Sequence, residues 1–161
     1  MLLPFHAGTR CLEPEIMDQP ALAAARHQHA LRGLERINRW SGSVRLFWPA
    51  LRRLAEQAAP RPIRVLDVGS GGGDVLRVLR RRARRVKLTM ILEGCDRSAA
   101  AVAYAQERAD AAGADLRFFA HDVLADALPA DYDAVVCALF LHHFDEAHAV
   151  GVFGPAGRGR A

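Results

Sequence analysis

The clearest pattern in the chain is a series of short apolar blocks separated by amphipathic segments. Four apolar runs have the length and content of buried strands, at residues 63–68, 88–95, 116–120 and 134–140. Because strands that alternate with helices pair in parallel, this order predicts an α/β fold with a Rossmann-like, doubly wound and mostly parallel sheet. No strand or helix pattern follows the fourth run, so we expect the sheet to end there.

The segments beside these runs carry the spacing of helices. Apolar residues recur at helical intervals over 74–82 and predict a helix there. Ser98 can cap a second, alanine-rich helix that Gly113 would end. Ahead of the first strand, residues 47–58 predict another helix, with Pro49 in its first turn.

The two ends of the chain differ from this core. Residues 1–17 show little periodicity, and a helix is expected from Asp18 to about Trp40. We therefore divide the chain into an N-terminal helical segment (1–60), a sheet domain (61–148) and a tail (149–161). The tail is rich in glycine and arginine and is expected to be disordered.

One stretch, Val-Leu-Asp-Val-Gly-Ser-Gly-Gly-Gly-Asp over residues 65–74, says most about chemistry. A strand ends near Asp67, glycines follow at every second position, and a helix begins at Asp74. A strand, a tight turn and a helix start in this order form the usual place where an α/β sheet holds a nucleotide-like ligand. The two carboxylates would repel a diphosphate and attract a ligand that carries an ammonium and a sulfonium. Counted from Gly69, the dinucleotide pattern G-x-G-x-x-G fails at Asp74. This spacing and the carboxylates disfavour an NAD(P)-dependent oxidoreductase, which we rank third among the possible functions.

Composition and charge narrow the range of possible partners, ligands and cellular settings. The formal charge of +4 comes with 22 basic residues, all arginine except Lys87, and their densest cluster (80–85) falls where a helix should end. This placement favours a solvated helix end over a nucleic-acid surface. Three distant cysteines without a C-x-x-C pair fit a reduced, cytoplasmic setting, and no residues have metal-ligand spacing. The longest apolar run is too short for membrane insertion.

With these landmarks, the chain resembles the class I S-adenosylmethionine (SAM)-dependent methyltransferases, and within them the small-molecule branch that includes the ubiquinone/menaquinone-type enzymes. Four blocks carry the resemblance in the family's order, at residues 65–73, 94–98, 121–124 and 132–144. Family members continue with a helix and three more strands, so the resemblance implies a domain truncated at its C-terminal end. It also implies SAM as the cofactor and a small molecule as the methyl acceptor.

The resemblance assigns the methionine and ribose ends of SAM to two blocks. Gly69, Gly71 and Gly73 would let the methionine part approach, because a side chain there would collide with it. Asp67 would orient the ammonium, directly or through water. Asp96 would accept hydrogen bonds from both ribose hydroxyls, the alternative being a helix cap beside the next helix.

The later blocks would hold the rest of the cofactor. Asp122 would accept a hydrogen bond from the adenine amino group and Val123 would pack on the ring, the alternative for Asp122 being an ordinary loop carboxylate. Ala138 and Leu139 would line the methionine end.

His142 and His143 follow the fourth strand, where the acceptor should approach. Either imidazole is suited to remove a proton from a phenol or enol near neutral pH, the alternative being a structural role, which is the more common one for a histidine of such a pair. The expected activity is methyl transfer to oxygen or carbon of a phenolic, quinone-like or polyketide acceptor, with the N-terminal helices covering the acceptor site. The alternative is a non-catalytic SAM-binding fragment or regulatory partner, and a bare sheet edge leaves self-association possible.

Overall fold

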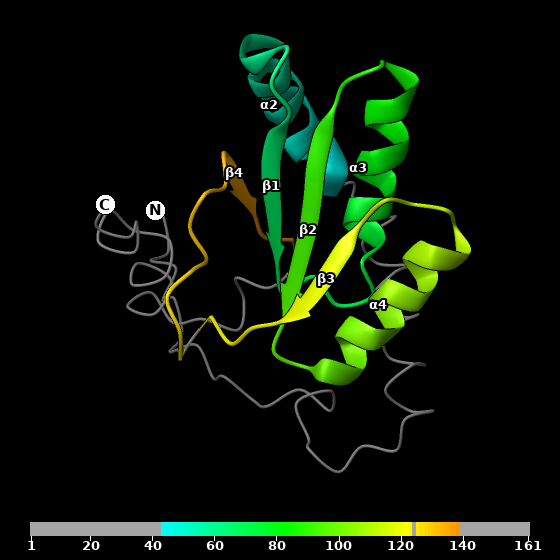
Figure 1. Ribbon diagram of the computed structural model, residues 1–161, viewed down its shortest axis with the longest axis vertical. Helices are drawn as coiled ribbons and strands as arrows, with labels where there is room; N and C mark the ends of the chain where they lie inside the picture. The colour runs from blue at the N-terminus through cyan, green and yellow to red at the C-terminus, as the bar shows by residue number, and fades with distance from the viewer. Residues whose placement is uncertain (1–42, 124, 139–161) are drawn as a thin grey trace, which may run out of the picture.

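Helices and strands alternate from α2 to β3, as the sequence pattern predicts, and β4 then follows β3 without a helix between them (Figure 1). The structure is a computed structural model that describes residues 43–123 and 125–138. Its elements are α2 (Ser43–Ala58), β1 (Ile63–Val68), α3 (Asp74–Arg85), β2 (Met90–Asp96), α4 (Ala99–Ala111), β3 (Arg117–Ala120) and β4 (Ala134–Val136). The predicted helix over 18–40 and the predicted tail lie outside the described residues.

The four strands form one sheet in the order β3-β2-β1-β4, and every neighbouring pair is parallel. Val65 of β1 lies between Leu92 of β2 and Ala134 of β4. All carboxyl ends of the strands therefore meet at one edge, and the predicted parallel α/β sheet is confirmed. Within the described ranges, no helix has the length and apolar character needed to cross a membrane.

The two faces of the sheet are covered differently. Ile63 and Val65 belong to a large apolar core that also contains buried residues of α2, α3 and α4, so the three helices pack on the same face. Leu66, Val68 and Cys95 face the other way, against residues of the loop between β3 and β4. Side chains alternate between the faces because successive residues of a strand point in opposite directions.

The element boundaries show where tertiary packing overrode the local pattern. α3 runs to Arg85 instead of 82, because Ala83 is fully buried and continues the inward stripe of the helix. β2 begins at Met90 and not at residue 88. The prediction that Pro49 lies in a first helical turn is wrong: α2 already begins at Ser43, where Val44 packs into the core. A buried apolar stripe thus stabilises a helix that contains an internal proline.

The arginine cluster at the end of α3 serves the fold. Arg80 donates hydrogen bonds to the backbone carbonyls of Met90 and Asp115, and Arg84 donates to that of Gly113. The guanidinium of Arg82 lies over the Trp48 ring, 6.0 Å from its centroid. Part of the cluster therefore fixes the connections of the sheet at the amino ends of the strands.

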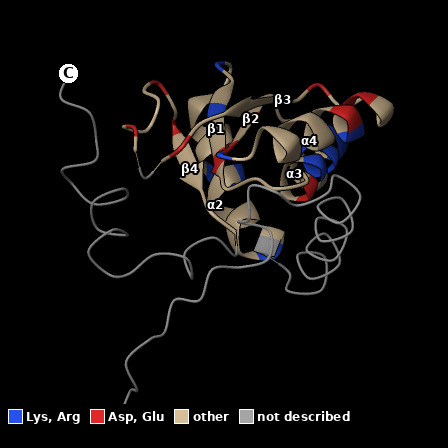
Figure 2. Ribbon diagram, turned by 90° about the horizontal axis from the view of Figure 1, so that it is seen from below, with Lys and Arg blue, Asp and Glu red and all other residues tan. Residues whose placement is uncertain are grey.

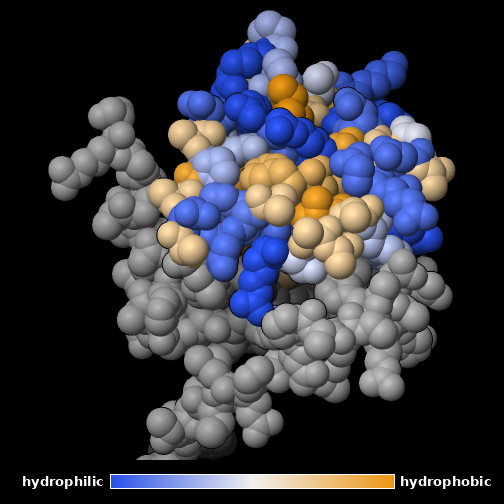
Figure 3. Space-filling model, turned by 60° about the horizontal axis from the view of Figure 1, so that its bottom comes forward, coloured by the Kyte–Doolittle hydropathy of each residue, from blue (hydrophilic) through white to orange (hydrophobic). Residues whose placement is uncertain are grey.

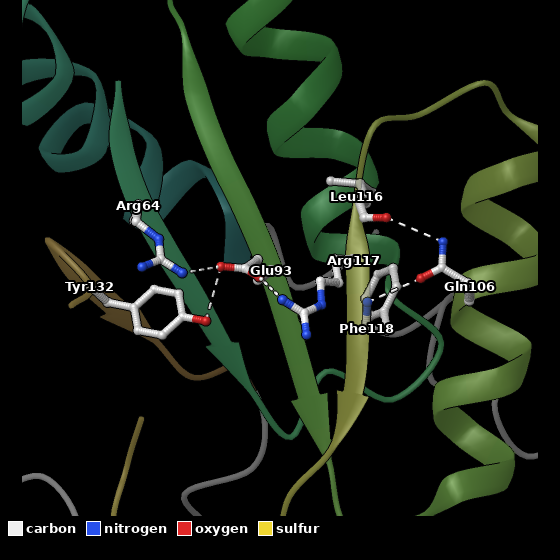
Figure 4. A network of polar contacts seen from close by, with 7 residues as sticks. All are labelled: Arg64, Glu93, Gln106, Leu116, Arg117, Phe118 and Tyr132. Atoms are coloured by element: carbon white, nitrogen blue, oxygen red, sulfur yellow. Dashed lines mark hydrogen bonds and ion pairs between the residues drawn. The ribbon is translucent and has the colours of Figure 1, made fainter. Parts of the chain in front are cut away.

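A polar network occupies the face of the sheet opposite the helices (Figure 4). Glu93, in the middle of β2, is 5% exposed and accepts hydrogen bonds from Arg64 (2.8 Å), Tyr132 (3.0 Å) and Arg117 (3.3 Å). Burial alone would raise the pKa of Glu93, but these hydrogen bonds and the two guanidinium charges hold it below its ordinary value. The network joins β1, β2 and β3 to the residues that precede β4.

The two faces predict different effects of truncating neighbouring residues of β2. Leu92→Ala should lower the free energy of unfolding by about 2–5 kcal/mol, because Leu92 is 1% exposed and truncation leaves a cavity under the helices. Ile91→Ala is the matched control, because Ile91 lies on the opposite face and is 41% exposed. This substitution should lower the free energy of unfolding by less than about 1 kcal/mol. Urea denaturation measures both, and equal losses would contradict the assignment of the faces.

Candidate functional site

The turn between β1 and α3 alternates between ordinary and left-handed backbone. Gly69, Gly71 and Gly73 have φ values of 65°, 49° and 69°, a region that glycine enters without steric penalty. The amide of Ser70 donates to the Cys95 carbonyl (3.0 Å), and that of Gly73 donates to the Ser70 carbonyl (2.8 Å). The spacing of the glycines is thus a requirement of the turn itself, before any ligand is considered.

Glycine at position 73 is also required by the packing beneath the loop. A Cβ atom there would stand 2.5 Å from Cζ of Phe118 and 3.2 Å from Cβ of Ala105. A side chain at position 73 would therefore collide within the protein, which is a requirement separate from the predicted collision with the ligand.

Asp67 is a buried carboxylate at the carboxyl end of β1. It is 1% exposed, and its Oδ2 has no hydrogen-bond partner among the described residues. Desolvation raises the pKa of Asp67 well above its ordinary value, and the charges of Asp74 and Asp96 raise it further. A buried carboxyl group of this kind is suited to a cationic or hydrogen-bond-donating ligand.

Asp96 ends β2 and ties the glycine loop to the next helix. Its Oδ2 accepts a hydrogen bond from the amide of Gly71 (3.0 Å), and its Oδ1 accepts one from the amide of Ser98 (2.9 Å). The Ser98 hydroxyl in turn accepts from the amide of Ala101 (3.2 Å), which confirms Ser98 as the cap of α4. Asp96 therefore has a structural role beside the helix start, while each of its oxygens keeps a further lone pair for a ligand.

Asp122 and Val123 follow β3 on the loop that crosses to β4. The amide of His121 donates to the Asp96 carbonyl (3.0 Å), which sets the start of this loop beside the end of β2. Val123 is 7% exposed and belongs to the apolar cluster of Leu66 and Cys95. The loop therefore brings Asp122 and Val123 to the same edge as Asp67 and Asp96.

The remaining predicted residues belong to the fourth strand and beyond. Ala138 follows β4 by two residues and packs, partly buried, against the main core. Leu139, His142 and His143 lie outside the described residues. The predicted positions at and after the ends of the first three strands thus come together with Ala138 at one end of the sheet.

Two views show the character of this edge. Figure 2 looks onto it from below, with acidic positions beside the strand ends and basic positions gathered around α3. In Figure 3, which also brings this end forward, apolar surface gathers in the middle of the face between hydrophilic residues.

Sequence reasoning missed Phe118, because its importance depends on register. Phe118 lies opposite Gly94 in the pairing of β2 with β3, and a Cβ at Gly94 would stand 2.7 Å from its ring. The available signal was an aromatic residue in a short strand beside a glycine in the preceding strand. Within the described ranges, no three side chains of His, Cys, Asp or Glu converge to hold a metal ion.

Comparison with known proteins gives a family match. A model of the methyltransferase domain matches residues 65–158. Demethylmenaquinone methyltransferase of Thermus thermophilus is 34% identical over 111 residues, which cover 65% of this chain. The same alignment covers 48% of that protein, so the chain spans about half the length of the curated relative it matches.

Two solved structures are similar in fold. The SAM-dependent methyltransferase SibL in its apo form is 28% identical with a TM-score of 0.50, over 64% of this chain and 30% of that chain. Magnesium protoporphyrin IX methyltransferase (ChlM) from Synechocystis PCC 6803 with bound SAM has a TM-score of 0.54 at 19% identity, over 81% of this chain and 69% of that chain. The second likeness concerns the fold alone.

The buried state of Asp67 predicts a variant that is more stable than the parent. Asp67→Asn removes a charge that burial disfavours, so it should raise the free energy of unfolding at pH 7 by on the order of 1–3 kcal/mol. Because the pKa of Asp67 is raised in the folded state, the parent is least penalised at low pH and loses stability as pH rises through that pKa. The gain should therefore shrink toward about pH 4.

Urea denaturation at both pH values measures this effect. Asp115→Asn is the matched control, because the Asp115 side chain is 94% exposed. Loss of stability in Asp67→Asn at pH 7 would contradict the account of the buried carboxyl group.

Proposed function

We propose that this chain, which belongs to the class I SAM-dependent methyltransferases, binds SAM at the carboxyl edge of its sheet and transfers a methyl group to a small molecule. The observation that carries the proposal is the buried Asp67 carboxyl group, whose Oδ2 has no partner among the described residues. An ammonium group there would supply the opposite charge that a buried carboxylate needs. The same acidic edge would repel the diphosphate of a dinucleotide.

The assignment of SAM to individual residues follows the family resemblance, and the geometry of the edge supports it. Asp67 would bind the ammonium of the amino-acid end beneath the glycine loop. Asp96 would accept hydrogen bonds from the ribose hydroxyls, since the amides of Gly71 and Ser98 already hold its two oxygens in place. Asp122 would accept from the adenine amino group, and the buried Val123 would contact the ring.

The residues after β4 would complete the site. Ala138 and Leu139 would line the amino-acid end. His142 and His143 are proposed to lie beside the acceptor, where one of them would take the proton of a phenol or enol as the new bond to carbon or oxygen forms. When bound, SAM supplies an electrophilic methyl group on a sulfonium. The chain would supply alignment and exclusion of water, the main needs of an in-line displacement.

The acceptor is proposed to be a phenolic, quinone-like or polyketide molecule, methylated on oxygen or carbon. By its name, the curated relative acts on demethylmenaquinone, and this supports the quinone-like class. We further propose that residues 1–60 cover the acceptor side, that residues 61–148 bind SAM and that residues 149–161 form a tail. A cytoplasmic setting without a nucleic-acid partner remains part of the proposal.

Loss of the Asp96 side chain should weaken cofactor binding strongly. Asp96→Ala removes acceptors for two ribose hydroxyls, and each hydrogen bond to a charged group contributes about 1.5–3 kcal/mol. The dissociation constants of SAM and S-adenosylhomocysteine should therefore rise at least about tenfold in calorimetry. Asp115→Ala removes the same charge at the other edge of the sheet and should leave binding unchanged. Unaltered binding by Asp96→Ala would exclude Asp96 from the ribose site.

The affinity for SAM should increase with pH below the pKa of an α-amino group, about 7.7–8.0. Burial raises the pKa of Asp67 and so favours the neutral carboxyl group in the free protein, whereas an ammonium ligand favours the carboxylate. Calorimetry between about pH 5 and 7 should show a falling dissociation constant. Asp67→Asn should bind more weakly with a flatter profile, and parallel profiles for the two proteins would count against an ammonium contact at Asp67.

A further inference from the structure

We propose that Phe118 is a positioning residue whose ring sets the shape of the glycine loop and thereby the affinity for the amino-acid end of SAM. This inference rests on the proposed function, because it concerns the same cofactor. Phe118 lies beneath the loop, and it is assigned no contact with the ligand.

The ring of Phe118 fills the space beneath the loop. Phe118 is 7% exposed, and its ring lies where a side chain on either of two glycines would project. A Cβ at Gly73 would stand 2.5 Å from Cζ and 2.8 Å from Cε1, and a Cβ at Gly94 would stand 2.7 Å from Cδ1 and 2.8 Å from Cε1. The ring is therefore in close contact with the backbone of both the loop and β2.

The backbone of Phe118 is itself held from the edge of the sheet (Figure 4). Gln106 of α4 accepts a hydrogen bond from the Phe118 amide through Oε1 (3.1 Å) and donates one to the Leu116 carbonyl through Nε2 (3.2 Å). Because β3 is the edge strand, these two backbone groups point away from β2. One glutamine side chain thus supplies the hydrogen bonds that a further strand would make. It holds the backbone of β3, and with it the Phe118 ring, in place beneath the loop.

The position of the ring determines where the loop backbone lies. Gly73 has a left-handed φ and directly precedes α3, so a shift there changes the direction in which the loop enters the helix. A Cβ at Gly94 would also stand 2.9 Å from Cβ of Ser70, so the loop is packed against β2 at a second point. A smaller ring would let the loop sink toward β2, and a longer one would push it outward. Either shift would move the loop relative to Asp67, which is anchored in β1.

The adenine and ribose residues should be less affected. Asp96 accepts one hydrogen bond from the loop, from the amide of Gly71, but it belongs to β2 and its other oxygen is held by the amide of Ser98 outside the loop. Asp96 and Asp122 lie beyond Phe118 along β2 and after β3, where Asp96 pairs with Ala120. A probe that keeps the nucleoside and lacks the amino-acid part therefore separates a loop effect from a general effect on the fold. The compound 5′-methylthioadenosine has this composition.

The experiment compares the binding of SAM and of 5′-methylthioadenosine to three variants by calorimetry. Phe118→Leu shortens the support, and Phe118→Tyr adds an oxygen at the ring atom that faces Gly73. Each should raise the ratio of the SAM dissociation constant to that of 5′-methylthioadenosine by about tenfold, since small displacements of positioned groups have effects of this order or larger. Phe119→Leu is the matched control, because Phe119 packs on the opposite face and any effect should fall on both ligands.

Three outcomes would overturn the inference. An unchanged ratio in folded Phe118→Leu and Phe118→Tyr proteins, or equal weakening of both ligands, would reduce Phe118 to a residue of the core. A ratio that rises equally in Phe119→Leu would show that the effect is not specific to the loop. Failure of the unchanged protein to bind SAM would overturn the proposed function together with this inference, so the two failures are distinguishable.

Discussion

The structure depends on how three carboxylates are accommodated at the carboxyl edge of a parallel sheet. Asp67 and Asp74 are 1% and 8% exposed, and Asp96 stands beside them at the end of β2. Two of them are stabilised in different ways: Asp74 lies in the first turn of α3, where the helix dipole favours a negative charge, and Asp96 accepts two backbone hydrogen bonds. The Oδ2 atom of Asp67 is buried and has no hydrogen-bond partner among the described residues, where the same holds for Ser70 Oγ, Arg80 Nε and His121 Nε2. The proposed binding of a cationic ligand rests on this arrangement.

The chain contains another buried carboxylate, Glu93, whose charge is compensated by neighbouring side chains. Glu93 accepts hydrogen bonds from two arginines and a tyrosine, and its pKa is lowered despite its burial. Asp67 lies one residue away from the cross-strand neighbour of Glu93 and has a raised pKa. A satisfied carboxylate in the middle of the sheet serves the fold, whereas an unsatisfied one at the strand ends is typical of a functional site.

Much of this arrangement could be predicted from local sequence. Apolar runs located the strands, the glycine spacing located the turn, and Ser98 was recognised as a helix cap, because each signal lies within a few residues. The interior position of Pro49, the Glu93 network and the contact of Phe118 with Gly73 and Gly94 could not be predicted. They depend on strand register and on contacts between residues that are distant in sequence, which no periodicity within one segment reveals. For Leu139, His142 and His143, the sequence remains the basis of the assignment.

The central claim is that the acidic edge selects a cationic nucleoside over a phosphorylated one. The most direct measurement is a side-by-side titration of the unchanged protein with SAM and with NADH, followed by calorimetry at neutral pH and low salt. We expect saturable binding of SAM and no saturable binding of NADH over the same concentrations. Binding of NADH as tight as that of SAM, or tighter, would contradict the account.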